Sequence, residues 1–191
     1  MADPPRTSET DPIEVAWLPP ALPGRIGLTL APGKRATSAL SPRPWRRDLG
    51  ADLDRLAEVH GVTTLVCLME DHELAACAIE RLPEAARERG IDLLRLPIPD
   101  GGVPEDPEAT RALVAEIVRR ARAGGRVVIH CRGGLGRSGT IAGAVLRSLG
   151  WGAEETLAAL RAARGPSCPE TAGQRSYVAA YRPDGAEGAG G

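Results

Sequence analysis

A cysteine, a run of glycines and an arginine follow one another within one short stretch of the chain. The stretch reads Val127-Val128-Ile129-His130-Cys131-Arg132-Gly133-Gly134-Leu135-Gly136-Arg137-Ser138-Gly139. The apolar residues before the cysteine predict a buried strand, and the apolar residues that recur after Ser138 predict a helix. A glycine-rich loop between a strand and a helix is an anion site, because its backbone N–H groups and the positive end of the helix dipole converge on one point.

The residue types in this loop favour attack of a thiolate on a phosphate group. Every dipole near Cys131 favours the thiolate, which is the nucleophilic form of the side chain. Arg137 follows the cysteine after five residues and can hold two phosphate oxygens with its planar guanidinium. Ser138 is expected to hydrogen-bond the sulfur. The loop that would bind the phosphate oxygens consists of Arg132, Gly133, Gly134, Leu135 and Gly136.

Two other interpretations of Cys131 explain less of the stretch. Free cysteines are often buried core residues, but that interpretation leaves the glycines, Arg137 and Ser138 unexplained together. Sulfurtransferases of the rhodanese type also place a cysteine before a loop that returns an arginine, typically with four intervening residues. The loop here has five, and the longer spacing favours a tetrahedral phosphoryl group over a persulfide.

The stretch resembles the His-Cys-x5-Arg-Ser/Thr signature of the cysteine-dependent phosphatases, in which a phosphocysteine forms and is hydrolysed. Further segments are similar to the cyclin-dependent-kinase-associated type of dual-specificity phosphatase and its bacterial relatives: Gly27-Leu28, Pro32-Gly33, Pro97-Ile98 and Asp100-Gly101-Gly102. The resemblance implies a protein-tyrosine-phosphatase-like α/β fold, no metal or other cofactor, and hydrolysis of phosphotyrosine, phosphoserine or phosphothreonine in proteins. The tryptophan that precedes the acid-loop proline in tyrosine-specific enzymes is absent, so strict phosphotyrosine selectivity is not expected.

A second group must protonate the oxygen that leaves phosphorus. Asp100 suits this role, because it lies 31 residues before Cys131 in the turn Pro97-Ile98-Pro99-Asp100-Gly101-Gly102. The glycines give this turn mobility and the prolines limit it. Glu105 and Asp106 are rival donors, although Asp106 also suits the N-cap of the next helix. A solvated turn aspartate is the ordinary alternative for Asp100.

Three further positions carry weaker signals. Gln174 matches a position at which related phosphatases place a glutamine that orients the hydrolytic water, and a surface glutamine is the alternative. His130 is predicted either to support the loop or to be a core histidine bonded to a backbone carbonyl. The run Glu70-Asp71-His72-Glu73 is expected to form a loop near the pocket, with a metal cluster or a solvated cap as alternatives.

Alternating predicted strands and helices indicate an α/β fold, in which a mainly parallel sheet has helices on both faces. The expected strands are 25–30, which we place at an edge, 63–69, 91–96 and 127–129. The expected helices begin at about 49, 73, 107, 137, 153 and 170, and Pro83 should kink or break the second. Ligands of such sheets collect beyond the carboxyl ends of the strands. That edge would carry Cys131, Asp100 and residues 70–73.

Length and composition indicate one domain of ordinary size in a chain of 191 residues. Residues 1–23 and 183–191 are rich in proline or glycine, so we expect mobile ends around a phosphatase domain spanning 24–182. No long apolar stretch or secretory signal is present. We therefore expect a cytoplasmic monomer with no membrane partner. The net charge of −1 offers no general attraction to nucleic acid.

The cysteine and arginine contents add two constraints. The cysteines show neither metal-site nor disulfide-framework spacing, which fits a reducing compartment and argues against zinc: Cys67, Cys77, Cys131 and Cys168. Of 24 basic residues only Lys34 is a lysine, and this bias is typical of a GC-rich bacterial genome. Single arginines such as Arg132 and Arg164 are therefore weak evidence for a phosphate contact, and a eukaryotic cyclin-dependent kinase is not an expected substrate.

The same residues would serve several functions. A phosphoprotein substrate is our first hypothesis, and a phosphoinositide, a nucleotide or an RNA 5′-phosphate is the alternative. Phosphatases of lipids tend to place lysines in the cysteine loop, and this loop has none. A phospho-binding module without turnover would be expected to lack Cys131, Asp100 or Arg137, and all three are present.

Overall fold

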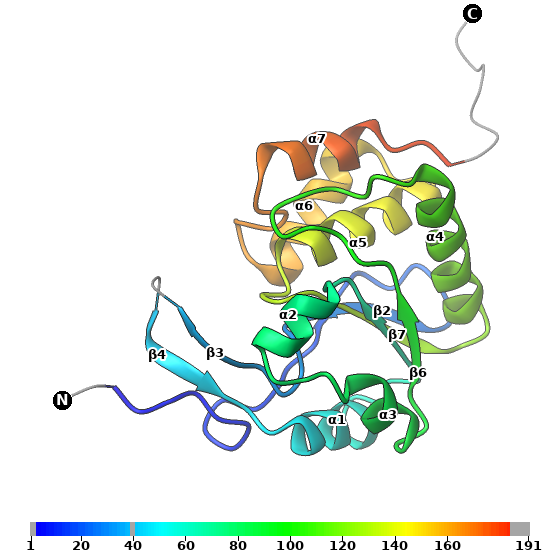
Figure 1. Cartoon of the computed structure of the whole chain (residues 1–191). Helices are drawn as coiled ribbons and strands as arrows, with labels where there is room; N and C mark the ends of the chain where they lie inside the picture. The colour runs from blue at the N-terminus through cyan, green and yellow to red at the C-terminus, as the bar shows by residue number, and fades with distance from the viewer. Residues whose placement is uncertain (1–2, 39–40, 184–191) are drawn as a thin grey trace, which may run out of the picture.

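The computed structural model describes residues 3–38 and 41–183, and a central five-stranded sheet organises them (Figure 1). In spatial order its strands are β1 (Ala16–Trp17), β2 (Arg25–Thr29), β7 (Arg126–His130), β5 (Thr64–Cys67) and β6 (Asp92–Arg95). Only β1 is antiparallel to its neighbour, and the other pairs are parallel. The structure confirms the expected mainly parallel sheet.

Helices cover both faces of the sheet, as expected (Figure 1). One layer contains α1 (Leu49–Glu58), α2 (Asp71–Ala76) and α3 (Leu82–Arg87). The other contains α4 (Pro107–Arg122), α5 (Gly136–Ser148), α6 (Ala153–Arg164) and α7 (Ala172–Ala180). The three central residues of β7 are apolar because both faces of the strand are covered: Val127 and Ile129 pack with α4 and α5, whereas Val128 packs with the other layer.

The local signals for helix α4 are confirmed. The Asp106 side chain accepts a hydrogen bond of 3.0 Å from the Ala109 N–H, and Pro107 occupies the first turn. The helix ends just before Gly124, whose φ of +88° is a left-handed conformation that glycine adopts without strain. The expected helix from residue 73 is interrupted as predicted, because α2 ends at Ala76 and α3 restarts with Pro83 in its first turn.

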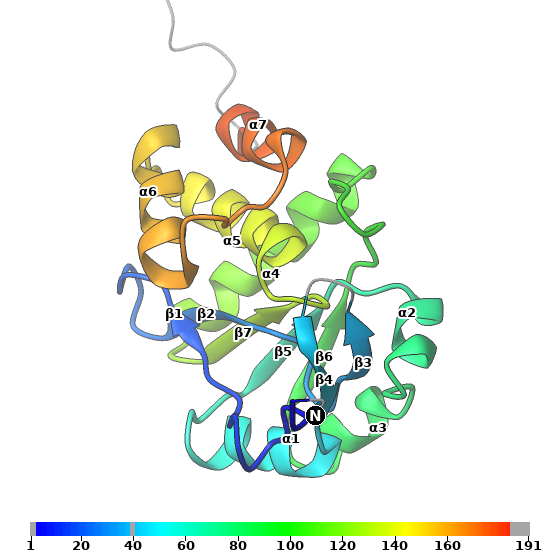
Figure 2. The same cartoon turned by 90° about the vertical axis from the view of Figure 1, so that its left-hand side faces the viewer.

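The prediction that residues 1–23 are mobile is wrong for the described part, residues 3–23. Ile13 and Val15 are buried in the core beside α1, and Leu18 is buried in the core of the other layer. The short strand β1 in this segment also covers β2, so that β2 is an interior strand and not the predicted edge strand (Figure 2). Sparse apolar residues between prolines gave no periodicity to detect. The predicted C-terminal tail lies outside the described residues except for Pro183.

A second sheet of two antiparallel strands was not predicted. Its strands are β3 (Arg35–Ser38) and β4 (Ser41–Arg46), which we call the β3–β4 ribbon. Figure 1 shows the ribbon standing away from the two helical layers. At its base, the Arg47 guanidinium donates to both carboxylate oxygens of Asp52 at 2.7 and 2.8 Å. Both side chains are only 1% exposed, so each charge depends on the other.

We expect Asp52→Ala to lower the free energy of unfolding by about 3–5 kcal/mol, because it leaves the buried Arg47 guanidinium without its partner. The Gly33 N–H, which donates to Asp52 at 2.8 Å, also loses its acceptor. Asp54→Ala is a matched control on the same helix, since Asp54 pairs with Arg89 in an exposed position worth about 0–1 kcal/mol. Urea unfolding measures both variants, and equal losses would contradict the assigned role of the buried pair.

Candidate active site

The cysteine loop, residues 132–136, follows Cys131 after β7 and includes the first residue of α5. Cys131 lies at the end of β7 with 3% of its surface exposed, and its Sγ accepts a hydrogen bond of 3.3 Å from the Gly134 N–H. The Ser138 Oγ lies 3.5 Å from the same sulfur, as expected. A backbone N–H and a hydroxyl thus meet at the sulfur, where each can donate a hydrogen bond to it.

Two glycines of the loop are required by close approaches. Gly134 has a φ of +73°, and a Cβ there would lie 2.3 Å from the Thr29 carbonyl oxygen. A Cβ at Gly136 would lie 2.5 Å from the Glu170 Oε2 and 2.8 Å from the Gln174 Oε1. The loop therefore packs against β2 on one side and against the segment leading into α7 on the other, and a larger residue would displace it.

Arg137 is held in place by three groups from two other segments. Its Nη1 and Nη2 donate to the two Glu73 carboxylate oxygens at 2.6 and 2.8 Å, and its Nη1 also donates to the Ile98 carbonyl at 2.9 Å. The Asp100 Oδ1 lies 2.9 Å from its Nη2. Arg137 is 1% exposed, so its guanidinium cannot change direction without losing these partners. The predicted acid and the predicted phosphate-binding arginine are therefore neighbours.

The run 70–73 was predicted to be a loop near the pocket, but it forms the N-cap and first turn of α2, and Glu73 of this run contacts Arg137. Its Oε2 also accepts a hydrogen bond of 3.0 Å from the Glu70 N–H, so the same carboxylate closes the first turn of α2. Burial raises the pKa of Glu73, but the hydrogen bonds from Arg137 and the backbone outweigh burial, and its pKa lies below the reference value of 4.5. The pair is therefore intact at neutral pH and is lost only as the pH falls through the lowered value.

Asp100 lies on the loop between β6 and α4, and its side chain is 64% exposed. The loop is fastened to the start of α7 by two bonds: the Gln174 Nε2 donates to the Gly102 carbonyl at 3.0 Å, and the Thr171 Oγ1 donates to the Gly101 carbonyl at 3.5 Å. An exposed carboxylate on a fastened loop beside Arg137 can reach an ester oxygen while its backbone stays in place. The rival donor Asp106 is used as the N-cap of α4.

Gln174 is buried, and both ends of its amide have protein partners. Besides its bond to Gly102, its Oε1 accepts a hydrogen bond of 3.1 Å from the Thr171 N–H. Its position against Gly136 brings it to the cysteine loop. The structure thus shows a residue that links α7 to the acid loop, and the role of Gln174 in orienting water stays a prediction.

His130 is fully buried directly before the nucleophile. Neither of its ring nitrogens has a hydrogen-bond partner within the described chain, so the carbonyl bond expected of an ordinary core histidine is absent there. Burial lowers the pKa of His130 to about 4. The ring is therefore neutral at pH 7, and it supports the end of β7 by packing without adding a charge.

Three side chains hold the cysteine loop from its outer side. The Arg164 Nε and Nη2 donate to the carbonyls of Gly134 and Gly133 at 2.9 and 3.1 Å. The Lys34 Nζ donates to the Arg132 carbonyl at 3.3 Å, and the Cys168 Sγ donates to the Leu135 carbonyl at 3.3 Å. Because the carbonyls of the loop accept hydrogen bonds on its outer side, its N–H groups can point inward. Arg164 is thus a positioning residue, and the sequence did not indicate the role of Lys34.

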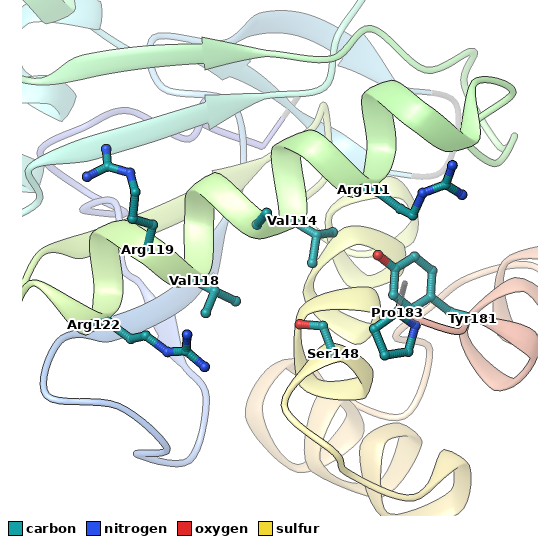
Figure 3. Close-up of a pocket in the computed structure, with 9 residues that line it drawn as sticks. Arg111, Val114, Val118, Arg119, Arg122, Ser148, Tyr181 and Pro183 are labelled. Atoms are coloured by element: carbon teal, nitrogen blue, oxygen red, sulfur yellow. The ribbon is translucent and has the colours of Figure 1, made fainter. Parts of the chain in front are cut away.

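A hollow of about 370 Å³ lies away from these residues, between α4, the end of α5 and Tyr181 (Figure 3). None of the predicted catalytic residues lines it. Among the described residues, no group of three or more histidine, cysteine or carboxylate side chains could hold a metal ion, and no helix is long and apolar enough to cross a membrane.

A cysteine at the end of a parallel strand, a five-residue loop and a buried arginine on the following helix define a cysteine-dependent phosphatase. The family model described as "PTP-SAK: Swiss Army Knife protein, DSP-PTPase phosphatase domain" matches residues 43–178. The chain belongs to this family, which confirms the dual-specificity phosphatase class that the resemblance implied.

Proteins that are related in sequence agree with this assignment. Cyclin-dependent kinase inhibitor 3 from Rattus norvegicus is 27% identical over 180 residues, covering 93% of this chain and 82% of the relative. The protein of the same name from Homo sapiens matches with the same identity and coverage. The expected similarity to the kinase-associated type is therefore confirmed.

Solved structures show the same similarity. The kinase associated phosphatase (KAP), in a form whose catalytic-site cysteine is replaced by serine, has a TM-score of 0.77 and 26% identity, covering 87% of this chain and 92% of that one. Tk-PTP in its active form has a TM-score of 0.63 and 31% identity, covering 81% and 89%. The fold and the cysteine chemistry are thus shared with known phosphatases.

We expect Glu73→Gln to lower kcat/KM for an aryl phosphate by about 10- to 100-fold, because small misplacements of a binding group cost this much. Asp71→Asn is the matched control on the same helix, since Asp71 is 85% exposed and pairs with Arg95 instead. Initial rates and vanadate inhibition measure both variants. Vanadate affinity should fall together with the rate for Glu73→Gln, and equal behaviour of the two variants would contradict the role of Glu73.

Proposed function

We propose that this phosphatase hydrolyses phosphate monoesters on protein side chains, phosphotyrosine as well as phosphoserine or phosphothreonine. The chemistry rests on one observation, the placement of Cys131 and a bidentately oriented Arg137 at opposite ends of a loop sized for a phosphoryl group. The protein substrate is supported by the kinase associated phosphatase among its relatives. Arg137 can hold two phosphate oxygens in line with the sulfur, which lowers the entropy cost of attack.

In the first step the Cys131 thiolate attacks phosphorus while the bond from phosphorus to the ester oxygen breaks. The arriving phosphate takes the place of Asp100 as the outer partner of Arg137, whose other side stays bonded to Glu73. The Asp100 carboxyl group donates a proton to the leaving oxygen, and a phosphocysteine and an alcohol or phenol result.

In the second step water attacks the phosphocysteine. The Asp100 carboxylate takes a proton from the water, the sulfur–phosphorus bond breaks, and inorganic phosphate and the thiolate are formed. The Ser138 hydroxyl, 3.5 Å from the sulfur, can donate a hydrogen bond to the departing thiolate. Gln174 Nε2 uses one of its two N–H groups on the Gly102 carbonyl, which leaves the other N–H group for the water. The cycle returns every group to its starting state, and its only co-reactant is water.

Cys131→Ser should abolish hydrolysis of an aryl phosphate while vanadate or phosphopeptide binding persists, because the backbone loop and Arg137 remain. The control is Cys77→Ser, the same change at a buried cysteine outside the loop. Steady-state rates and equilibrium binding measure the two properties separately. Substantial turnover by Cys131→Ser would contradict the phosphocysteine mechanism.

Asp100→Asn should slow hydrolysis of tyrosyl and alkyl phosphates by about 10²- to 10⁴-fold, the usual contribution of general acid catalysis. Nitrophenyl phosphate should lose much less, because nitrophenolate leaves without a proton. Rates for a series of esters with different leaving-group pKa values measure the difference. Equal losses across the series, or a larger effect of Glu105→Gln, would reassign the acid.

A further inference from the structure

The β3–β4 ribbon and the residue before it bring a cluster of positive charges to the cysteine loop. Trp45 lies at the centre of this cluster, with the Lys34 Nζ 5.0 Å and the Arg6 Cζ 4.8 Å from its ring centroid. Arg35 and Arg46 flank the same tryptophan along the ribbon, where Arg35 pairs with Arg46 in the strand register. The aromatic ring allows the cations to lie close together, since its face attracts positive charge.

Lys34 connects this cluster to the catalytic centre. Its Nζ donates a hydrogen bond of 3.3 Å to the Arg132 carbonyl, and Arg132 directly follows the nucleophile Cys131. Lys34 is only 9% exposed, and no other hydrogen-bond acceptor for its ammonium lies within the described chain. Two of its three donors are therefore available to a ligand at the edge of the cysteine loop.

The cluster has more positive than negative charge. The neighbouring Arg43 and Arg47 pair with Asp11 and Asp52. Other cations have no carboxylate within 4.0 Å among the described residues: Arg6, Lys34, Arg35, Arg46 and Arg132. Burial lowers the pKa of Lys34, and this outweighs the raising effect of the nearby cysteines Cys77 and Cys131, while the charges of Arg132 and Arg6 add to the lowering. Arg35 and Arg46 are exposed, whereas Arg6 and Arg132 are partly buried and Lys34 is buried. Buried cations without a counter-charge are costly, so an anion bound beside these three would stabilise the arrangement.

A hollow next to the cluster provides room for such an anion. It has a volume of about 550 Å³ and is lined by Arg35, Ala36, Pro44, Trp45 and Arg46. Trp45 borders the hollow and also contacts Lys34, although Lys34 and Arg132 are not among the lining residues. No carboxylate is among the lining residues, so nothing there opposes a dianion.

We propose that Lys34 and Arg132, together with Arg46 of the ribbon, bind a second phosphate group of the substrate while the first lies in the cysteine loop. This subsite rests on the proposed phosphatase function and refines its substrate class to molecules with two phosphate groups close together. The second phosphate comes either from a second phosphorylated residue of a protein or from a small molecule with neighbouring phosphates. The guanidinium group of arginine and the ammonium group of lysine are the side-chain groups that bind phosphate most strongly.

The test compares matched substrates with one and two phosphates. A phosphotyrosine peptide is measured with and without a phosphoserine two residues away, and an inositol monophosphate is measured beside its bisphosphate. We expect kcat/KM to be about tenfold higher with the second phosphate, as one hydrogen bond between charged groups provides. The preference should shrink at about 0.5 M salt, because partly exposed charges are screened.

Three variants test which residues produce the preference for a second phosphate. Lys34→Met keeps the apolar stem of the side chain and removes its charge, and Arg46→Gln removes a charge that does not touch the cysteine loop. Both should reduce the preference for the second phosphate. Arg122→Gln, an exposed charge on the distant α4, should leave it unchanged. If Lys34→Met lowers the rates for one and two phosphates equally, Lys34 only holds the loop and the subsite is wrong.

The remaining outcomes separate the subsite from the proposed function. The carrier for which the preference appears, peptide or inositol, identifies the source of the second phosphate. Hydrolysis of every substrate without any preference would overturn the subsite and leave the phosphatase function standing. No hydrolysis at all would overturn the proposed function, and equilibrium binding of the paired peptides to Cys131→Ser would then decide the subsite: equal affinities would reject it.

Discussion

The bidentate pair between Arg137 and Glu73 is the interaction on which the active site depends. A guanidinium that is almost fully buried must have partners, because an unpaired buried charge costs several kcal/mol. Glu73 supplies two of them from α2, and Ile98 and Asp100 supply others from the loop after β6. The need to pair one cation therefore brings two segments, distant in the sequence, to the end of β7. Asp100, the proposed acid, is thereby brought to the arginine that follows the cysteine loop.

The cysteine loop is held in place differently, because side chains from other segments donate hydrogen bonds to its backbone carbonyls. Arg164, Lys34 and Cys168 bond four successive carbonyls, from Arg132 to Leu135, and come from α6, the segment before β3 and the segment before α7. A loop fixed in this way needs no reorganisation when phosphate binds, which is the source of electrostatic catalysis in such sites. Arg137, the proposed phosphate-binding arginine, is thus one of several cations that lie around the loop.

The sequence predicted what depends on short spacing and missed what depends on distant contacts. One short stretch of the sequence contains Cys131, Arg137 and Ser138, and it was enough to predict that these residues lie together. Glu73 was placed near the pocket, but its pairing with Arg137 spans 64 residues and left no local pattern. The ribbon was missed because its strands, Arg35–Ser38 and Ser41–Arg46, mix prolines and arginines and lack apolar alternation.

The packing of the N-terminal segment has a consequence for solubility. Strand β1 pairs with β2, so the edges of the sheet are the two-residue strand β1 and the strand β6. β6 begins with Asp92 and ends with Arg95, and both are exposed charges that discourage pairing with another chain. β2 has no such protection, because after Arg25 all its residues are buried. Without the segment before it, β2 would be a flat apolar edge, the kind of surface on which sheets of separate molecules join.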